Sequence, residues 1–242
     1  MQSAPKSQLS WFALVVAISS LWTAHGADGS TSTLNQLTPA EKAAGWQLLW
    51  DGATTTGWRG YNQKTFPDHG WVIEDGCLHR ASAGGDIITD ALYDEFELEF
   101  DWKIAPGANS GLKYFVLEAP GGAIGHEYQI VDDQLNSDGK RGAKWRTAAF
   151  YDVIPAATNK VLLPPGQFNH SRILVKGKHV EHWLNGGKTV EYELESAELD
   201  EAIATSKFRK VTTFNKLLKG HILLQDHGDE VWFRNLKIRL PK

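Results

Sequence analysis

The chain has 242 residues, of which 42% are hydrophobic, 11% aromatic and 22% charged. This much apolar surface can be buried in a core, so a disordered chain is excluded. The formal net charge is -4 and no basic stripe is visible, so nucleic acid is not expected as a partner. The single cysteine, Cys77, excludes an internal disulfide framework and a thiolate zinc site.

The N-terminus has the pattern of a secretory signal peptide. Lys6 precedes an apolar run over residues 11–22, and small residues then lead to Gly26. The run is short for a bilayer span, which needs about 20 apolar residues; an uncleaved N-terminal anchor is the alternative. We predict that residues 1–26 are a signal peptide, that the protein is exported to the periplasm or the extracellular space, and that no integral membrane segment remains after cleavage.

One short helix is predicted directly after the signal. Residues 27–45 begin as a polar linker, and Thr38-Pro39-Ala40-Glu41 is then a capping box with proline at the first helical position. Gly45 ends this helix. A second short helix is predicted over residues 196–204. No internal repeat or mid-chain linker is visible, so residues 46–242 are predicted to form one domain.

Most of the remaining chain follows the two-residue period of β-strands. In residues 95–104 every even position is apolar and every odd position is charged, as in a strand with one buried face. Asp75-Gly76 suits a type I′ turn between strands at 71–74 and 77–80. Further strands are predicted at 172–176, 179–184 and 188–194, with a last pair at 221–225 and 231–240. Strands joined by turns predict an all-β jelly-roll sandwich of antiparallel sheets.

Polar side chains interrupt the apolar pattern of two predicted strands. Glu127 and Gln129 share one strand face, which suits gripping a polar ligand or holding a base; an exposed polar face is the alternative. Asn109 opens another strand at a bend, and Lys113 follows it on the same face as Phe115. A lysine held there stabilises an oxyanion, unless its amine extends to solvent along an apolar stem.

A third group lies where a strand ends. Gln225 and His227 share a face, and a histidine there can act as a general acid or base near neutral pH. The histidines form no His-Glu-x-x-His zinc motif, and His179 and His182 are predicted on opposite faces of their strand, which argues against a shared metal.

Known hydrolase motifs are absent from the chain. Glu99-Phe100-Asp101 nearly matches the Glu-x-Asp-x-x-Glu motif of one jelly-roll glucanase family, but Ile104 stands where the second glutamate would be. The paired carboxylates of ordinary glycoside hydrolysis are therefore missing there. Neither a Gly-x-Ser-x-Gly nucleophile elbow nor a phosphate-binding loop occurs.

Several short motifs occur in an order that resembles the 3-keto-disaccharide hydrolase family, over roughly residues 46–240. They are Leu49-Trp50-Asp51-Gly52, Gly57-Trp58, Trp71-Val72-Ile73-Glu74-Asp75-Gly76, Asn109-Ser110-Gly111, Glu127-Tyr128-Gln129, Asn185-Gly186, Leu224-Gln225-Asp226-His227-Gly228 and Phe233-Arg234-Asn235-Leu236-Lys237-Ile238. The resemblance implies a concanavalin-A-like jelly roll in an exported protein. It also implies cleavage, either by hydrolysis or by β-elimination through removal of the C2 proton, of glycosides that were first oxidised to a ketone at C3 of the sugar, with carbohydrate as the partner.

Such a reaction needs one base and one group that stabilises an enolate oxygen. We assign the base to Glu127 or His227, and we expect the side chains of Gln129, Gln225, Lys113 and Asn109 to hold the sugar and its keto oxygen. Asp132 is a candidate substrate contact and the conceivable ligand of a divalent cation. Whether a cation takes part is left open by the sequence, as is the oligomeric state, and no organic cofactor is expected.

Two other functions compete with this interpretation. A non-catalytic carbohydrate-binding module would use the same sandwich, with Trp58, Trp145 and Trp183 stacking on sugars. A structural domain of the cell envelope would leave the polar residues scattered. The Gly-rich, charged segment 136–145 is interpreted as a mobile loop near the cleft entrance, either a lid or an ordinary surface loop.

Overall fold

The computed structural model describes Met1 and residues 33–119, 122–216 and 218–241. Almost all of the predicted signal peptide lies outside these residues, so export and cleavage stay predictions. Within the described ranges, no helix is both long enough and apolar enough to cross a membrane.

The helices of the described chain are short, and both predicted ones are confirmed. In α1 (Pro39–Ala43), the Glu41 amide donates to Thr38 Oγ1 at 3.2 Å, and the Thr38 amide donates to Glu41 Oε2 at 2.7 Å. This reciprocal capping satisfies two amides that a helix start otherwise leaves unpaired. The others are α2 (Ser137–Arg141), α3 (Ala197–Ala204) and the single-turn 3₁₀ helices η1 (Ala143–Trp145) and η2 (Lys207–Lys210).

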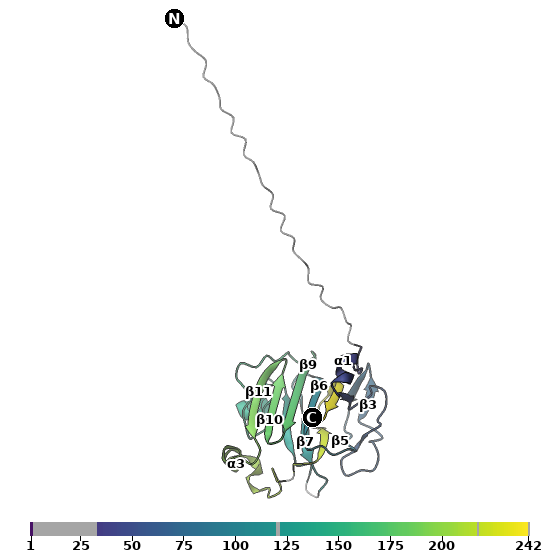
Figure 1. Ribbon diagram of the computed structural model, residues 1–242, viewed down its shortest axis with the longest axis vertical. Helices are drawn as coiled ribbons and strands as arrows, with labels where there is room; N and C mark the ends of the chain where they lie inside the picture. The colour runs from purple at the N-terminus through teal and green to yellow at the C-terminus, as the bar shows by residue number, and fades with distance from the viewer. Residues whose placement is uncertain (2–32, 120–121, 217, 242) are drawn as a thin grey trace. The chain divides into compact units, whose positions relative to one another are not determined.

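Eight strands form the larger of two antiparallel sheets (Figure 1). Their order is β11-β10-β9-β6-β13-β4-β3, and β1 pairs with β13 beside this path. The bounds are β1 (Gln47–Leu48), β3 (Trp71–Glu74), β4 (Cys77–Arg80), β6 (Phe96–Ile104), β9 (Asn169–Lys176), β10 (His179–Leu184), β11 (Gly187–Glu193) and β13 (Val231–Arg239). The predicted hairpin at Asp75-Gly76 is present, and both turn residues have positive φ, 49° and 67°.

Five strands form the second sheet, in the order β2-β5-β12-β7-β8. They are β2 (Trp58–Gly60), β5 (Ile87–Thr89), β7 (Asn109–Val116), β8 (His126–Val131) and β12 (His221–Leu224). The predicted last pair is wrong, because β12 pairs with β5 and β7 whereas β13 pairs with β1, β4 and β6 in the other sheet. The chain changes sheets between these two strands, which strand periodicity alone does not reveal.

The core lies between the two sheets. It unites Phe96, Leu98 and Phe100 of β6 with Tyr114 of β7 and Tyr128 of β8, all fully buried. Their burial explains the alternation over residues 95–104, because every second side chain of β6 enters this core. The predicted all-β antiparallel sandwich is confirmed.

A bulge in β7 changes which residues share a face. His221 pairs with Val116 and Leu223 with Lys113, so β7 carries one extra residue between these pairs. Phe115 has φ 58° and packs edge-on against Phe96 in the core. The predicted shared face of Lys113 and Phe115 is therefore wrong, and Lys113 alone points to the face away from the core.

Candidate functional site

Charged side chains meet on the face of the five-stranded sheet that is turned away from the core. The register of β7 and β8 sets Lys113 opposite Glu127, and Lys113 Nζ lies 3.7 Å from Glu127 Oε2. Glu127 is only 4% exposed. A buried carboxylate whose paired ammonium group lies beyond hydrogen-bonding distance keeps acceptor capacity for another group.

Gly111 provides the floor of this site. It pairs with Gln129 of β8, and its carbonyl accepts the Gln225 amide at 3.0 Å, so Gln225 lies just beyond the end of β12. A Cβ at position 111 would lie 3.1 Å from Glu127 Oε1 and 3.2 Å from Gln225 Oε1. These two oxygens therefore converge over the glycine from either side.

The Gln225 oxygen is available to a ligand. It is buried, and among the described residues it has no hydrogen-bond partner. An unpaired buried acceptor costs free energy, which a hydroxyl group of a bound molecule would recover.

Asp86 is a residue of this site that the sequence analysis missed. It precedes β5, and its Oδ1 accepts the Asp226 amide at 2.8 Å. Burial raises the pKa of the Asp86 carboxyl, and the charges of Asp226 and Glu127 act in the same direction, whereas the hydrogen bond from the Asp226 amide and the charge of Lys113 oppose the rise. The diglycine before Asp86 was a signal for a close approach of backbone to ligand.

A tyrosine and a second lysine, also missed, close the other side. The backbone amide of Tyr151 donates to the Glu127 carbonyl at 3.0 Å. The Tyr151 hydroxyl donates to Asp138 Oδ2 at 2.8 Å. Lys207 Nζ lies 4.1 Å from the centre of the Tyr151 ring. Burial lowers the pKa of Lys207, and the Glu127 charge opposes this shift. Burial and the Asp138 carboxylate both raise the pKa of Tyr151, so its hydroxyl stays protonated.

Asn109 and His227 both lie beside Asp138. Asn109 Nδ2 is 3.5 Å from Asp138 Oδ2, and Asn109 Oδ1 is buried with no partner in the described chain. Burial raises the pKa of Asp138, but hydrogen bonds from Tyr151 and Arg141 outweigh it, so the pKa is lowered. His227 is exposed, and its charge also lowers the pKa of Asp138. The structure therefore brings His227 to the rim of the group that contains Glu127.

Gln129 and Asp132 are not brought into this group. Gln129 is 0% exposed, and its Nε2 donates to the Trp145 carbonyl at 3.4 Å. Asp132 uses both carboxylate oxygens to accept backbone amides, from Gly107 at 2.9 Å and from the turn that follows it. Both side chains therefore hold loops in this structure, and their contact with a substrate or a cation stays a prediction.

A group of residues with metal-ligand geometry occurs elsewhere. His179, Glu181 and Glu191 are the one such cluster in the described part of the chain, and they lie on β10 and β11 of the larger sheet. Lys188 Nζ already lies 3.2 Å from Glu181 and 2.6 Å from Glu191. As predicted, His182 lies on the opposite face, fully buried.

The tryptophans expected to stack on sugars do not form a platform. Trp58 is 3% exposed and donates its ring N–H to the Leu49 carbonyl, so its predicted role is wrong. Trp183 lies on the larger sheet beside Arg172, whose guanidinium is 5.3 Å from its ring centre. Trp145 stacks with Arg141 at 4.3 Å.

The segment 136–145 is built as helical turns rather than as an open loop. Asn136 caps α2 by accepting the Asp138 amide at 2.9 Å, and η1 follows directly. This cap fixes Asp138, the residue that binds the Tyr151 hydroxyl. The segment is thereby part of the wall of the site.

The fold and site define a class: antiparallel β-sandwich proteins with charged and polar side chains gathered on one sheet face. The particular family follows from comparison with known proteins. The chain belongs to the 3-keto-alpha-glucoside-1,2-lyase-like domain family, which matches residues 45–239.

Relatives support this placement. A protein of Bacteroides thetaiotaomicron named 3-keto-disaccharide hydrolase is 33% identical over 231 residues, which cover 82% of this chain and 79% of the relative. A crystal structure from Parabacteroides distasonis, provisionally described as a glycosyl hydrolase, has a TM-score of 0.80 at 33% identity and covers 87% of this chain and 100% of its own. A second crystal structure from the same organism has a TM-score of 0.64 at 27% identity and covers 81% of this chain and 99% of its own. Family and relatives together indicate a glycosyl hydrolase-like function.

Proposed function

We propose that this protein is an enzyme that cleaves the glycosidic bond of glycosides with a ketone at C3 of the sugar. One observation carries the proposal: the oxygens of Glu127 and Gln225 converge over Gly111, with Lys113 Nζ 3.7 Å from Glu127. A single buried carboxylate beside an ammonium group supplies a base and an electrostatic partner for an enolate. The family and the named relative support the choice of substrate class.

The chemistry follows from the ketone. It acidifies the hydrogen at C2, so a base removes that proton and the electron pair of the C2–H bond forms an enolate. The enolate then re-forms the C3 carbonyl while the electron pair at C2 forms a C1=C2 double bond and expels the glycosidic oxygen from C1. That oxygen leaves with the aglycone and takes up a proton. Addition of water across the double bond completes a hydrolysis. This route needs one base rather than the two carboxylates of ordinary glycosidases.

Each side chain has a part in this route. Glu127 is the better of the two candidate bases, since it is buried beside Lys113 whereas His227 is exposed at the rim. Lys113 stabilises the negative charge that develops on the enolate oxygen. Gln225 and Asn109, whose oxygens are buried and unpaired within the described residues, accept hydrogen bonds from sugar hydroxyls.

The test uses one glycoside in two forms, with a 3-keto sugar and with the same sugar unoxidised. The proposal predicts release of the aglycone from the 3-keto form alone, and equal cleavage of both forms would contradict it. A parallel reaction with a chelator, followed by re-addition of a divalent cation, decides whether a cation takes part. Binding of both forms without cleavage of either would support a carbohydrate-binding module instead.

A further inference from the structure

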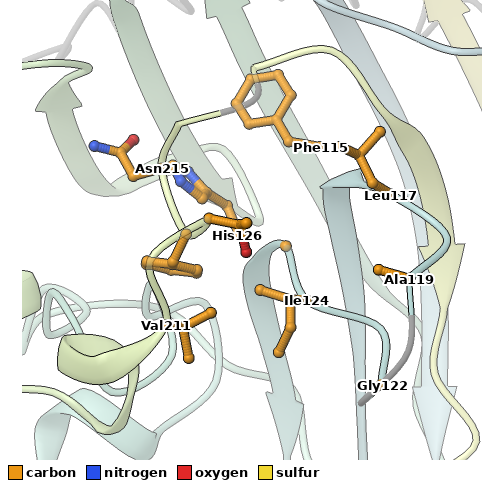
Figure 2. A pocket seen from close by; sticks show the side chains of 11 residues that line it. Phe115, Leu117, Ala119, Gly122, Ile124, His126, Val211 and Asn215 are labelled. Carbon is orange, nitrogen blue, oxygen red and sulfur yellow. The ribbon is translucent and has the colours of Figure 1, made fainter.

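A separate pocket of about 290 Å³ lies at the start of β8 (Figure 2). The segment that leads into β8 and the segment after η2 form much of its wall, with Ile124 and Val211 among the lining side chains. Its volume is close to the lower end of the range for small-molecule sites, about 300 Å³.

The pocket is distinct from the Glu127 site. His126 lines the pocket, and consecutive side chains of a strand point to opposite faces. His126 accordingly packs in the core, with its ring centre 4.6 Å from that of Phe150, whereas Glu127 points away from the core toward Lys113. The two sites therefore lie on opposite faces of β8.

The walls of the pocket suit an apolar molecule. Phe115, Leu117 and Phe214 line it together with Ile124 and Val211, and none of its lining residues is charged. An ionised ligand would lose its hydration there without gaining an ion pair. The pocket thereby favours a neutral ligand.

Two polar atoms break the apolar lining. His126 Nε2 and Asn215 Oδ1 are each buried, in residues that are 1% and 7% exposed, and neither makes a hydrogen bond of good geometry in the described part of the chain. The Asn215 side chain is nevertheless close enough to His126 to oppose the fall of the imidazole pKa. Figure 2 shows the two side chains next to each other at one side of the pocket. Buried unpaired polar atoms are rare in native proteins and call for a partner.

The hydrogen bonds behind His126 bear on which partner fits its Nε2 atom. Its Nδ1 lies 2.8 Å from the Tyr192 hydroxyl, which in turn lies 2.7 Å from the Tyr114 hydroxyl. Burial keeps the imidazole neutral, so one ring nitrogen carries a hydrogen and the other does not. When Tyr192 donates to Nδ1, Nε2 becomes a donor beside the acceptor Asn215 Oδ1. A hydroxyl group, which donates and accepts at once, matches this pair.

We propose that the pocket binds a small neutral apolar molecule that carries one hydroxyl group, with phenol as the simplest example. The hydroxyl lies between His126 Nε2 and Asn215 Oδ1, and the ring packs among the apolar walls. This binding site is independent of glycoside cleavage.

The experiment titrates phenol and toluene into the full-length protein and measures the dissociation constants by protein-observed NMR. Toluene has the same shape without the hydroxyl. Because one net hydrogen bond is worth about 1.4 kcal/mol, phenol is expected to bind about tenfold more tightly than toluene. The Glu127→Gln variant is expected to bind phenol as the wild type does.

Variants locate the site. Val211→Trp fills the pocket and is expected to abolish phenol binding, whereas Thr212→Trp, at an exposed neighbour that does not line the pocket, leaves it unchanged. Asn215→Leu is expected to remove the preference for phenol over toluene and to keep toluene binding. Circular dichroism confirms folding, and Ile124→Trp replaces Val211→Trp if that variant is unfolded. No preference for phenol in the wild type, or phenol binding that survives the tryptophan, would overturn the proposal.

Discussion

Strands β6 and β8 both carry acidic side chains, and the surroundings of these side chains differ. On β6, Glu97 Oε1 lies 2.5 Å from Arg172 Nε, and Glu99 Oε2 lies 2.8 Å from Lys237 Nζ. On β8, Glu127 has Lys113 at 3.7 Å, and its Oε1 lies 3.1 Å from the place that a Cβ on Gly111 would occupy. A carboxylate that accepts short ion pairs is already occupied, whereas Glu127 retains acceptor capacity for a substrate.

The comparison explains why the near-match to a glucanase motif on β6 carries no site. Asp101 Oδ1 lies 2.8 Å from His170 Nδ1, and its Oδ2 accepts from Asn235 at 2.7 Å, so the motif residues form a cross-strand network on the larger sheet. Residue type alone does not mark a catalytic acid. Unpaired polar atoms nearby, such as Gln225 Oε1, are the better indicator.

The largest expected effect tests the difference between Glu127 on β8 and the carboxylates on β6 directly. Glu127→Gln is expected to lower turnover of a 3-keto glycoside by about 10² to 10⁴-fold, the usual contribution of a general base. Glu99→Gln is the matched control on β6 and is expected to leave turnover unchanged. Initial rates at equal folded concentration measure both variants, and equal losses would show that the two strands do not differ as described.

A second variant tests the cation that faces Glu127. Lys113→Met is expected to lower turnover by about 10²-fold, the cost of removing one group that stabilises an oxyanion. Lys103→Met, whose amine stacks on Trp232 at 4.1 Å on the other sheet, is the control. If Lys113→Met raises KM without lowering kcat, the lysine binds the sugar and does not stabilise the enolate.

Buried histidines on the core side of the strands make the free energy of unfolding depend on pH. Burial lowers the pKa of His126 and of His182 to about 3, from 6.5. Below pH 6.5 the unfolded chain therefore binds protons that the folded chain does not, so stability falls as pH falls, by about 1.4 kcal/mol per pH unit for each histidine. This histidine contribution ends near pH 3, where the folded histidines also become protonated.

Urea unfolding at pH 7, 6 and 5 measures this slope. His182→Gln is expected to reduce the slope by about 1.4 kcal/mol per pH unit, the contribution of one imidazole. A stability that stays level between pH 6 and pH 5 would show that the two imidazoles are not held neutral.

The smallest expected effect concerns the floor of the site. Gly111→Ala places a methyl group 3.1 Å from Glu127 Oε1 and 3.2 Å from Gln225 Oε1, so both side chains must shift by a few tenths of an ångström. We expect a loss of turnover of about tenfold, less than the ~10²-fold cost of a 1 Å displacement. Gly187→Ala, whose Cβ would meet only the Leu184 carbonyl at 3.6 Å, is the control. Unchanged turnover in Gly111→Ala would contradict the convergence of the two oxygens.

Much of the fold was predictable because its signals are local. Alternation over residues 95–104, the Asp75-Gly76 turn and the Thr38 capping box each act within a few residues. The sheet change between β12 and β13 was not predictable, because either pairing satisfies the same alternation.

The site was predictable only in part, because most of its contacts join segments that are distant in sequence. Period-2 spacing set Glu127 and Gln129 on one face, but a loop that packs over β8 buries Gln129. Asp86, Tyr151 and Lys207 reach the site from segments far apart in sequence. The glycine pair before Asp86 is a local signal, but nothing local to Tyr151 or Lys207 specifies their approach.

The central claim, that Glu127 removes the C2 proton, is tested most directly by running the reaction in D₂O and analysing the 3-keto sugar product by NMR at short times. We predict that product formed by the wild-type enzyme carries deuterium at C2, because the original proton is removed and a solvent deuteron returns when water adds. Glu127→Gln is expected to form almost no such product. Full turnover by the wild type with the original C2 hydrogen retained would contradict the mechanism.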